Sequence, residues 1–114
     1  MKEVKAIIQP FMLTRVVDAL KQIEGLPGLT VDVDVHGFGR SRASKAAHKI
    51  TLEEIEYAKK AKLEIVVEDD MVDVVVKTIL DNAHTGNPGD GKIFIIDVEN
   101  AYRIRTGEQG KDAL

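Results

Sequence analysis

The chain has 114 residues, a size typical of one domain, and its 44% hydrophobic content is enough for a core. It has no cysteine, which excludes disulfides, thiolate catalysis and cysteine-ligated zinc, and its net charge of −3 disfavours general nucleic-acid binding. No apolar run reaches the ~18 residues of a membrane span and no signal peptide is visible, so we expect a cytoplasmic protein.

Hydrophobic patterns predict alternating strands and helices in the first part of the chain. Residues 4–8 form a short apolar run typical of a strand. Helical periodicity begins at Thr14, a candidate N-cap, and we expect that helix to end at Gly25. Residues 29–36 alternate apolar and polar side chains, which predicts a half-buried strand.

The second part of the chain repeats this order after a long connection. Residues 37–59 lack a strand pattern, and a connection of this length in a compact domain is usually functional or disordered. A strand at 63–67, a helix capped by Asp69 or Asp70 and a strand at 93–96 follow. The order predicts an α+β fold with a ferredoxin-like βαββαβ antiparallel sheet and helices on one face. Because the other face lacks a cover, we expect self-association.

Residues 85–92 read Thr-Gly-Asn-Pro-Gly-Asp-Gly-Lys and match the phosphate-binding pattern G-x-x-x-x-G-K. A P-loop would continue with Ser or Thr and open a helix, whereas Ile93 and an apolar strand follow here. Glycine lets the backbone approach a ligand closely, and unpaired N–H groups bind anions. The segment therefore predicts a phosphate-binding loop and favours nucleotide sensing over hydrolysis.

Four segments of the chain share motifs with one protein family. They are Ala-Ile-Ile-Gln-Pro-Phe (6–11), Gly-Phe-Gly-Arg (37–40), Thr-Gly-Asn-Pro-Gly-Asp-Gly-Lys-Ile-Phe (85–94) and Arg-Ile-Arg-Thr-Gly-Glu (103–108). In this order they resemble the PII signal-transduction proteins over nearly the whole chain. The resemblance implies a homotrimer that binds ATP or ADP in clefts between its ferredoxin-like subunits. It also implies that a T-loop docks on a transporter or metabolic enzyme, in nitrogen metabolism.

The resemblance assigns loops and nucleotide-binding positions within this single domain. The loops are a T-loop at about 39–59, a B-loop at about 84–92 and a C-terminal loop at about 103–114. The positions expected near the adenosine are Thr30, Glu64 and Thr85, those at the T-loop base are Gly37, Gly39 and Arg40, and those holding phosphates in the B-loop are Gly89, Asp90, Gly91 and Lys92. Arg103 and Arg105 match two arginines that reach the phosphates from the neighbouring subunit, and their i, i+2 spacing puts both on one side of an extended segment.

Several positions depart from the family pattern. Ser41 stands where the family has a glutamine that helps to hold magnesium and 2-oxoglutarate, and Gln9 replaces a basic residue, whereas Lys60 matches the lysine that pairs with a 2-oxoglutarate carboxylate. Each charged hydrogen bond contributes roughly 1.5–3 kcal/mol, so the loss of a magnesium ligand and of one cation should weaken the binding of 2-oxoglutarate considerably. Whether 2-oxoglutarate and Mg²⁺ bind therefore stays open. Glu53 stands at the position of the uridylylated tyrosine, so we expect control by ligand occupancy.

Two other functions stay open from the residues themselves. A slow ATPase would use the same loop, but no nucleophile–base pair or carboxylate cluster is apparent, so we expect no enzyme and assign no catalytic residue. A sensor linked to metal or other small-ligand transport would use His36, His48 and His84, although these lack ligand spacing and we assign no metal site.

Overall fold

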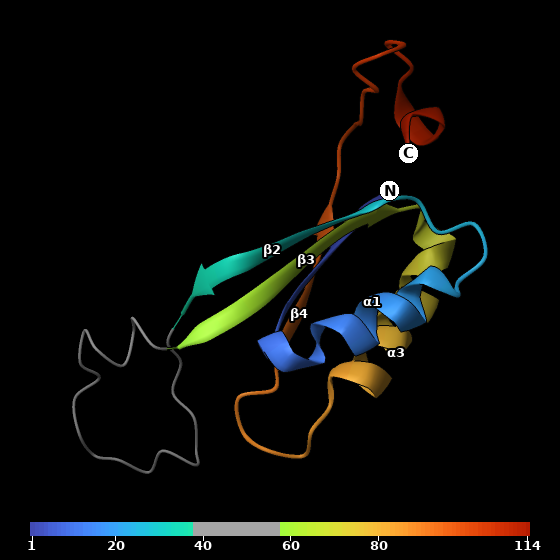
Figure 1. Ribbon diagram of the computed structural model, residues 1–114. Coiled ribbons are helices and arrows are strands. Elements are labelled where there is room, and N and C mark those ends of the chain that lie inside the picture. The colour runs from blue at the N-terminus through green and yellow to red at the C-terminus, as the bar shows by residue number, and fades with distance from the viewer. Residues whose placement is uncertain (38–57) are drawn as a thin grey trace.

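The computed structural model describes residues 1–37 and 58–114. Within them, one four-stranded sheet has the order β2-β3-β1-β4, and the neighbouring strands are antiparallel. The elements are β1 (Lys2–Ile8), α1 (Leu13–Lys21), β2 (Leu29–His36), β3 (Lys59–Val67), α3 (Val72–Ala83) and β4 (Gly91–Asp97). Figure 1 shows both helices on one face of the sheet. The predicted α+β, ferredoxin-like arrangement is confirmed.

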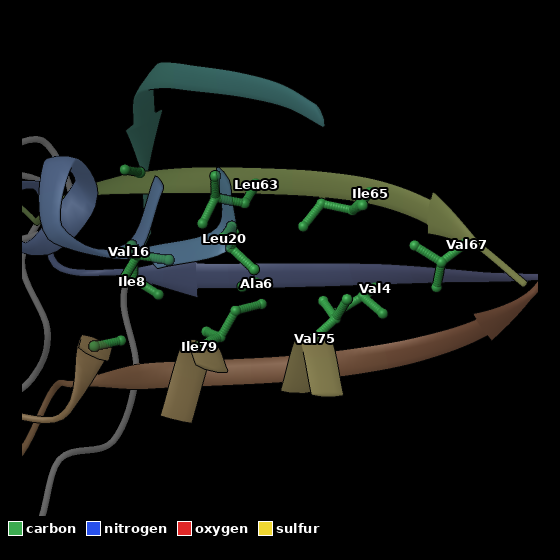
Figure 2. Close-up of a cluster of buried hydrophobic side chains, with 12 residues drawn as sticks. Val4, Ala6, Ile8, Val16, Leu20, Leu63, Ile65, Val67, Val75 and Ile79 are labelled. Atoms are coloured by element: carbon green, nitrogen blue, oxygen red, sulfur yellow. The ribbon is translucent and has the colours of Figure 1, made fainter. Parts of the chain in front are cut away.

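The core lies between the sheet and the two helices. Burial alternates along β1 and β3, because successive side chains of a strand point to opposite faces. Each helix contributes a buried pair four residues apart, Val16 with Leu20 and Val75 with Ile79, which places both members on one helical face. Figure 2 shows these side chains packed against those of the strands. The complete buried cluster is Val4, Ala6, Ile8, Val16, Leu20, Ala61, Leu63, Ile65, Val67, Val75, Ile79 and Ala83.

Both helices begin after a 3-10 turn and not at a capping side chain. Thr14 lies inside α1, whose N-cap residue is Met12, so the predicted cap at Thr14 is wrong. Met71 is the N-cap residue of α3, so the predicted cap at Asp69 or Asp70 is also wrong. In each case the preceding turn supplies a backbone hydrogen bond of 3.0 Å that leads directly into the helix, so no side-chain acceptor is needed there.

β2 has the predicted bounds but not the predicted burial. Val31 is 36% exposed and Val33 is 65% exposed, so the expectation of a half-buried strand is wrong for the single subunit. The physical reason is position: β2 is an edge strand, and Figure 1 shows its C-terminal end reaching past the helices. Its valines therefore form an uncovered apolar edge.

The face of the sheet opposite the helices is mostly polar along its two central strands. Lys62 pairs with Glu64 at 3.4 Å, and Lys5 lies 3.8 Å from Glu3. On β4 the same face carries Phe94, which is 47% exposed. Both described helices lie on the other side of the sheet (Figure 1), in line with the sequence-based expectation of one open side, although Ala113 and Leu114 approach this face beside Glu3 and Glu64.

Candidate functional site

The Asp90 carboxylate organises the phosphate loop (residues 84–90), which connects α3 to β4. Its Oδ2 accepts the N–H groups of Thr85 at 2.8 Å and Gly86 at 3.2 Å, and its Oδ1 accepts the Thr85 hydroxyl. The Thr85 hydroxyl oxygen also accepts the N–H of Asn87 at 3.1 Å. The first half of the loop is therefore held by its own side chains.

These contacts favour the ionised form of Asp90. Hydrogen bonds from the Thr85 hydroxyl, and then from the Thr85 and Gly86 amides, hold the pKa of the Asp90 carboxyl below its ordinary value of 3.8. Its acceptor oxygens point into the loop, where N–H and O–H groups surround them. An aspartate next to a phosphate would repel it, so this inward direction matters for anion binding.

Two adjacent amides of the loop remain available to an anion. The amides of Thr85, Gly86 and Asn87 are used internally, and proline at position 88 has no N–H. Among the described residues, the Gly89 and Asp90 amides donate to no acceptor. Successive free N–H groups of this kind form an anion-binding nest.

Gly91 and Lys92 already belong to β4, so the predicted B-loop ends inside a strand. Gly91 has φ +110°, and a Cβ placed there would lie 1.8 Å from the Ile7 carbonyl oxygen, so only glycine fits. Lys92 is opposite Ile7 in the β1–β4 register. It precedes Ile93, which packs against the core, so Lys92 points to the open face of the sheet.

Thr30 and Glu64 form a second group of predicted site residues. They face each other across β2 and β3 and line a cavity of about 430 Å³. Ala113 and Leu114 of the C-terminal segment line the same cavity, as does Glu3. The Oε2 atom of Glu3 is buried and has no hydrogen-bond partner among the described residues. Sequence reasoning did not identify Glu3, Ala113 or Leu114, because this cavity forms only where the folded C-terminal segment meets β1 and β3.

The C-terminal segment folds back on itself beyond β4. Tyr102 and Gln109 form an isolated antiparallel bridge, and a 3-10 turn follows at Gly110–Ala113. Arg103 donates to Glu108 at 3.3 Å and to the Leu114 carbonyl at 3.0 Å. Arg103 therefore lies beside the cavity that contains Thr30 and Glu64.

The structure separates the predicted phosphate-binding residues into two places on one chain. Lys92 lies near the start of β4, and the strand ends at Asp97. At about 3.3 Å per residue, these two positions are roughly 16 Å apart. Figure 1 shows the segment that carries Arg103 and Arg105 continuing beyond the far end of β4, away from the loop. One chain therefore does not bring the arginines to its own phosphate loop.

The remaining predicted positions lie at the T-loop. The Gly37 amide donates to the Ala58 carbonyl at 3.0 Å, which joins the two ends of the T-loop. The other T-loop positions fall outside the described residues: Gly39, Arg40, Ser41, His48 and Glu53.

The two described histidines have separate surroundings. The Nδ1 of His36 lies 4.0 Å from the Asp34 carboxylate, and His84 begins the phosphate loop. In the part of the chain that the structure describes, no group of three or more His, Asp or Glu side chains is arranged to hold a metal ion.

An apolar groove of about 580 Å³ runs between α3 and β4 and was not predicted. Val76, Leu80 and Ile95 line it, and it reaches His84 and Asp90 at the phosphate loop. The sequence signal for it is the continuous apolar run of β4, since a strand with one solvated face would alternate.

Comparison with known proteins shows which family this chain is similar to. The family model described as Nitrogen regulatory protein P-II matches residues 1–108. The chain belongs to the P-II family. Over all 114 residues and the full length of each relative, this P-II chain is 45% identical to nitrogen regulatory protein P-II 1 of Escherichia coli K12 and 43% identical to nitrogen regulatory protein P-II of Pasteurella multocida.

The P-II fold agrees with a solved structure as well. The crystal structure of Arabidopsis thaliana PII bound to citrate matches with a TM-score of 0.79 and 41% identity, covering 99% of this chain and 91% of that one. The P-II chain is thus a signalling protein of the nitrogen regulatory class. None of its described helices is long and apolar enough to cross a membrane.

Proposed function

We propose that this P-II chain binds ATP or ADP at sites shared between the subunits of a homotrimer. The observation that carries the proposal is the separation of its cationic groups. Lys92 adjoins the phosphate loop, whereas Arg103 lies beyond the opposite end of β4. A polyphosphate at the loop of one subunit would meet Arg103 and Arg105 of the next subunit.

The chemistry of the phosphate loop suits a polyphosphate. The Gly89 and Asp90 amides supply two adjacent N–H donors, and Lys92 supplies a nearby positive charge. The Asp90 carboxylate is turned away into the loop, so it does not offer a bare charge to the ligand. This half of the site has the donors for phosphates, and the groove that adjoins it is lined mainly by apolar side chains.

The second half of the proposed site lies at the other end of the subunit. Thr30 and Glu64 offer a hydroxyl and a carboxylate in the same cavity, which suits ribose hydroxyls and the amino group of adenine. The cavity adjoins the C-terminal segment that carries Arg103. One neighbouring subunit would therefore supply the adenosine contacts and the arginines together, completing the loop half.

The uncovered surfaces support a closed ring of subunits. Val31 and Val33 leave the β2 edge apolar, and the groove beside Leu80 leaves an apolar surface near the β4 edge. Different surfaces on the two edges favour a head-to-tail contact, and such contacts close into rings when the rotation allows it. Three copies would give three equivalent sites.

The output of the proposed sensor is the T-loop, at about residues 39–59, which would dock on a transporter or metabolic enzyme of nitrogen metabolism. Gly37 and Ala58 join its two ends next to the sheet. A nucleotide that contacts Gly39 and Arg40 at the loop base would favour some loop conformations over others, and only such differential binding can shift their populations.

Calorimetry with ATP, ADP and AMP, combined with light scattering, tests the proposal. We expect a trimer that binds ATP and ADP more tightly than AMP, because the loop and arginines contact the distal phosphates. Parallel titrations with Mg²⁺ and with 2-oxoglutarate determine whether either takes part. A stable monomer that binds ATP with full affinity would contradict the shared site.

A further inference from the structure

The Gly89 carbonyl of the phosphate loop accepts two hydrogen bonds from side chains, one from just after β1 and one from β3. The Gln9 amide nitrogen donates to it at 2.7 Å, and the Lys60 ammonium donates to it at 2.9 Å. We name this arrangement of Gln9, Lys60 and the Gly89 carbonyl the Gly89 anchor. It joins the residue after β1 and a residue of β3 to a single backbone atom.

Strand register explains why these residues meet. Ile8 pairs with Ala61 on one side and with Gly91 on the other. One step further along β1, Gln9 therefore comes opposite Lys60 on one side and beside the end of the phosphate loop on the other. The contact is close, since a Cβ at Gly89 would lie 3.1 Å from the Gln9 amide nitrogen.

The anchor fixes the direction of an amide as well as a carbonyl. A trans peptide group is planar, so its N–H points opposite to its C=O, and the described peptide bonds include no cis bond. When the Gly89 oxygen points to Gln9 and Lys60, the N–H of Asp90 must point away from them. This N–H is one of the two loop amides that have no protein acceptor within residues 1–37 and 58–114.

We propose that Gln9 and Lys60 are positioning residues, which aim the Asp90 N–H at a bound phosphate by holding the Gly89 carbonyl. The proposal rests on the proposed nucleotide site. Gly89 has φ +94°, a conformation that glycine adopts without strain but does not itself enforce. Without the two donors, the peptide group after Gly89 would sample several orientations, and a ligand would have to order it.

The use of two donors on one acceptor makes a specific prediction about double variants. Either donor alone still holds the carbonyl, so Gln9→Met and Lys60→Met should each weaken ATP binding by less than about fivefold. The double variant should weaken it by more than the product of the single effects, because only then is the peptide group released. In this double-mutant cycle the effect of losing the Lys60 charge cancels, since that loss occurs both with and without Gln9.

The measurements are ATP calorimetry and the amide chemical shift of Asp90 in the protein without nucleotide. The double variant should shift the Asp90 resonance and lose ATP affinity. Because arginine keeps a donor at position 60, the variant that combines Gln9→Met with Lys60→Arg should have the wild-type resonance and ATP affinity. Lys77→Met removes an exposed charge on α3. It should leave the Asp90 resonance in place and change ATP affinity by no more than about twofold. If the double variant does not fold, Gln9→Glu combined with Lys60→Met, which also removes both donors and keeps nearly the same size at position 9, provides the same readouts.

The outcomes separate this proposal from the proposed function. If the wild-type chain fails to bind ATP, the nucleotide function is wrong, while a shifted Asp90 resonance still supports the anchor. An unchanged Asp90 resonance in the double variant overturns the anchor, whatever the ATP affinity. A shifted resonance with wild-type ATP affinity overturns the positioning role.

Discussion

Asp90 and Thr85 are joined twice, because the Asp90 carboxylate accepts both the hydroxyl and the backbone N–H of Thr85. Thr85 and Asp90 are five positions apart in the chain, so the double contact closes the glycine-rich loop on itself. A carboxylate within a phosphate loop would otherwise oppose an anionic ligand. Here the N–H and O–H groups around it compensate its charge, and the neighbouring amides of Gly89 and Asp90 stay available.

The first prediction concerns the pH dependence of the loop. Because the pKa of Asp90 is lowered in the native state, its stabilisation is present above the ordinary value of 3.8 and declines as the pH falls through the lowered native pKa. Hydrogen exchange at Thr85 and Gly86, corrected for intrinsic rates, should therefore accelerate only at acidic pH. Asp90→Asn should exchange faster at neutral pH and lose this dependence.

Asp69 provides a matched control for that experiment. Its pKa is also lowered, through its bond to the N-terminal amine of Met1 at 2.6 Å, and it lies far from the loop in sequence. Asp69→Asn should change acid stability without altering exchange at Thr85. Equal acceleration of the loop amides in both variants would show that global unfolding, and not the Asp90 contacts, controls their exchange.

The second prediction is that Gly91→Ala destabilises the fold. The new methyl group would meet the Ile7 carbonyl oxygen at 1.8 Å, and the residue would keep a φ of +110° that alanine rarely adopts. Steric displacement and backbone strain should together cost at least ~2 kcal/mol. Urea denaturation measures the loss. Gly28→Ala, where no atom lies within 4 Å of the new methyl and φ is not positive, should stay within about 0.5 kcal/mol of wild type.

The sequence predicted the fold well wherever local pattern and tertiary packing agree. Val16 with Leu20, and Val75 with Ile79, show helical spacing, and all four are buried. The same logic failed for Val33, because alternation indicates which face a side chain occupies but not whether another element covers that face. The predicted helix start at Thr14 was wrong for a related reason, since a backbone turn precedes the helix in place of the expected side-chain cap.

The candidate site was predictable in composition but not in its internal contacts. The glycines and Lys92 follow from a local motif, whereas the role of Gln9 requires the register that places it next to Gly89. In the sequence, Gln9 was notable only because it replaces a basic residue of the family pattern. Likewise, Glu3 and Leu114 are more than 100 residues apart, and only the folded C-terminal segment brings them to one cavity.

The third prediction tests which phosphates the proposed site contacts. Lys92→Ala and Arg103→Ala should each weaken ATP binding by ~1.5–3 kcal/mol, or roughly 10- to 150-fold, and weaken AMP binding much less. The reason is that both cations are expected at distal phosphates that AMP lacks. Calorimetry with both nucleotides measures this, with Lys77→Ala as the control for loss of an exposed charge. Equal losses for ATP and AMP would show that these cations do not contact the distal phosphates.

The fourth prediction tests the sharing of the site between subunits. If Lys92 and Arg103 act on one nucleotide from different chains, neither variant alone has an intact site, but a mixed trimer does. Random assembly of the two variants in equal amounts gives a chain with Lys92 next to a chain with Arg103 at about one site in four. Co-refolded mixtures should therefore regain high-affinity ATP binding at about a quarter of their sites, whereas each refolded variant alone should regain none. If the mixture binds ATP no better than its components, both residues act within one chain, or not on the same ligand, and the shared site is wrong.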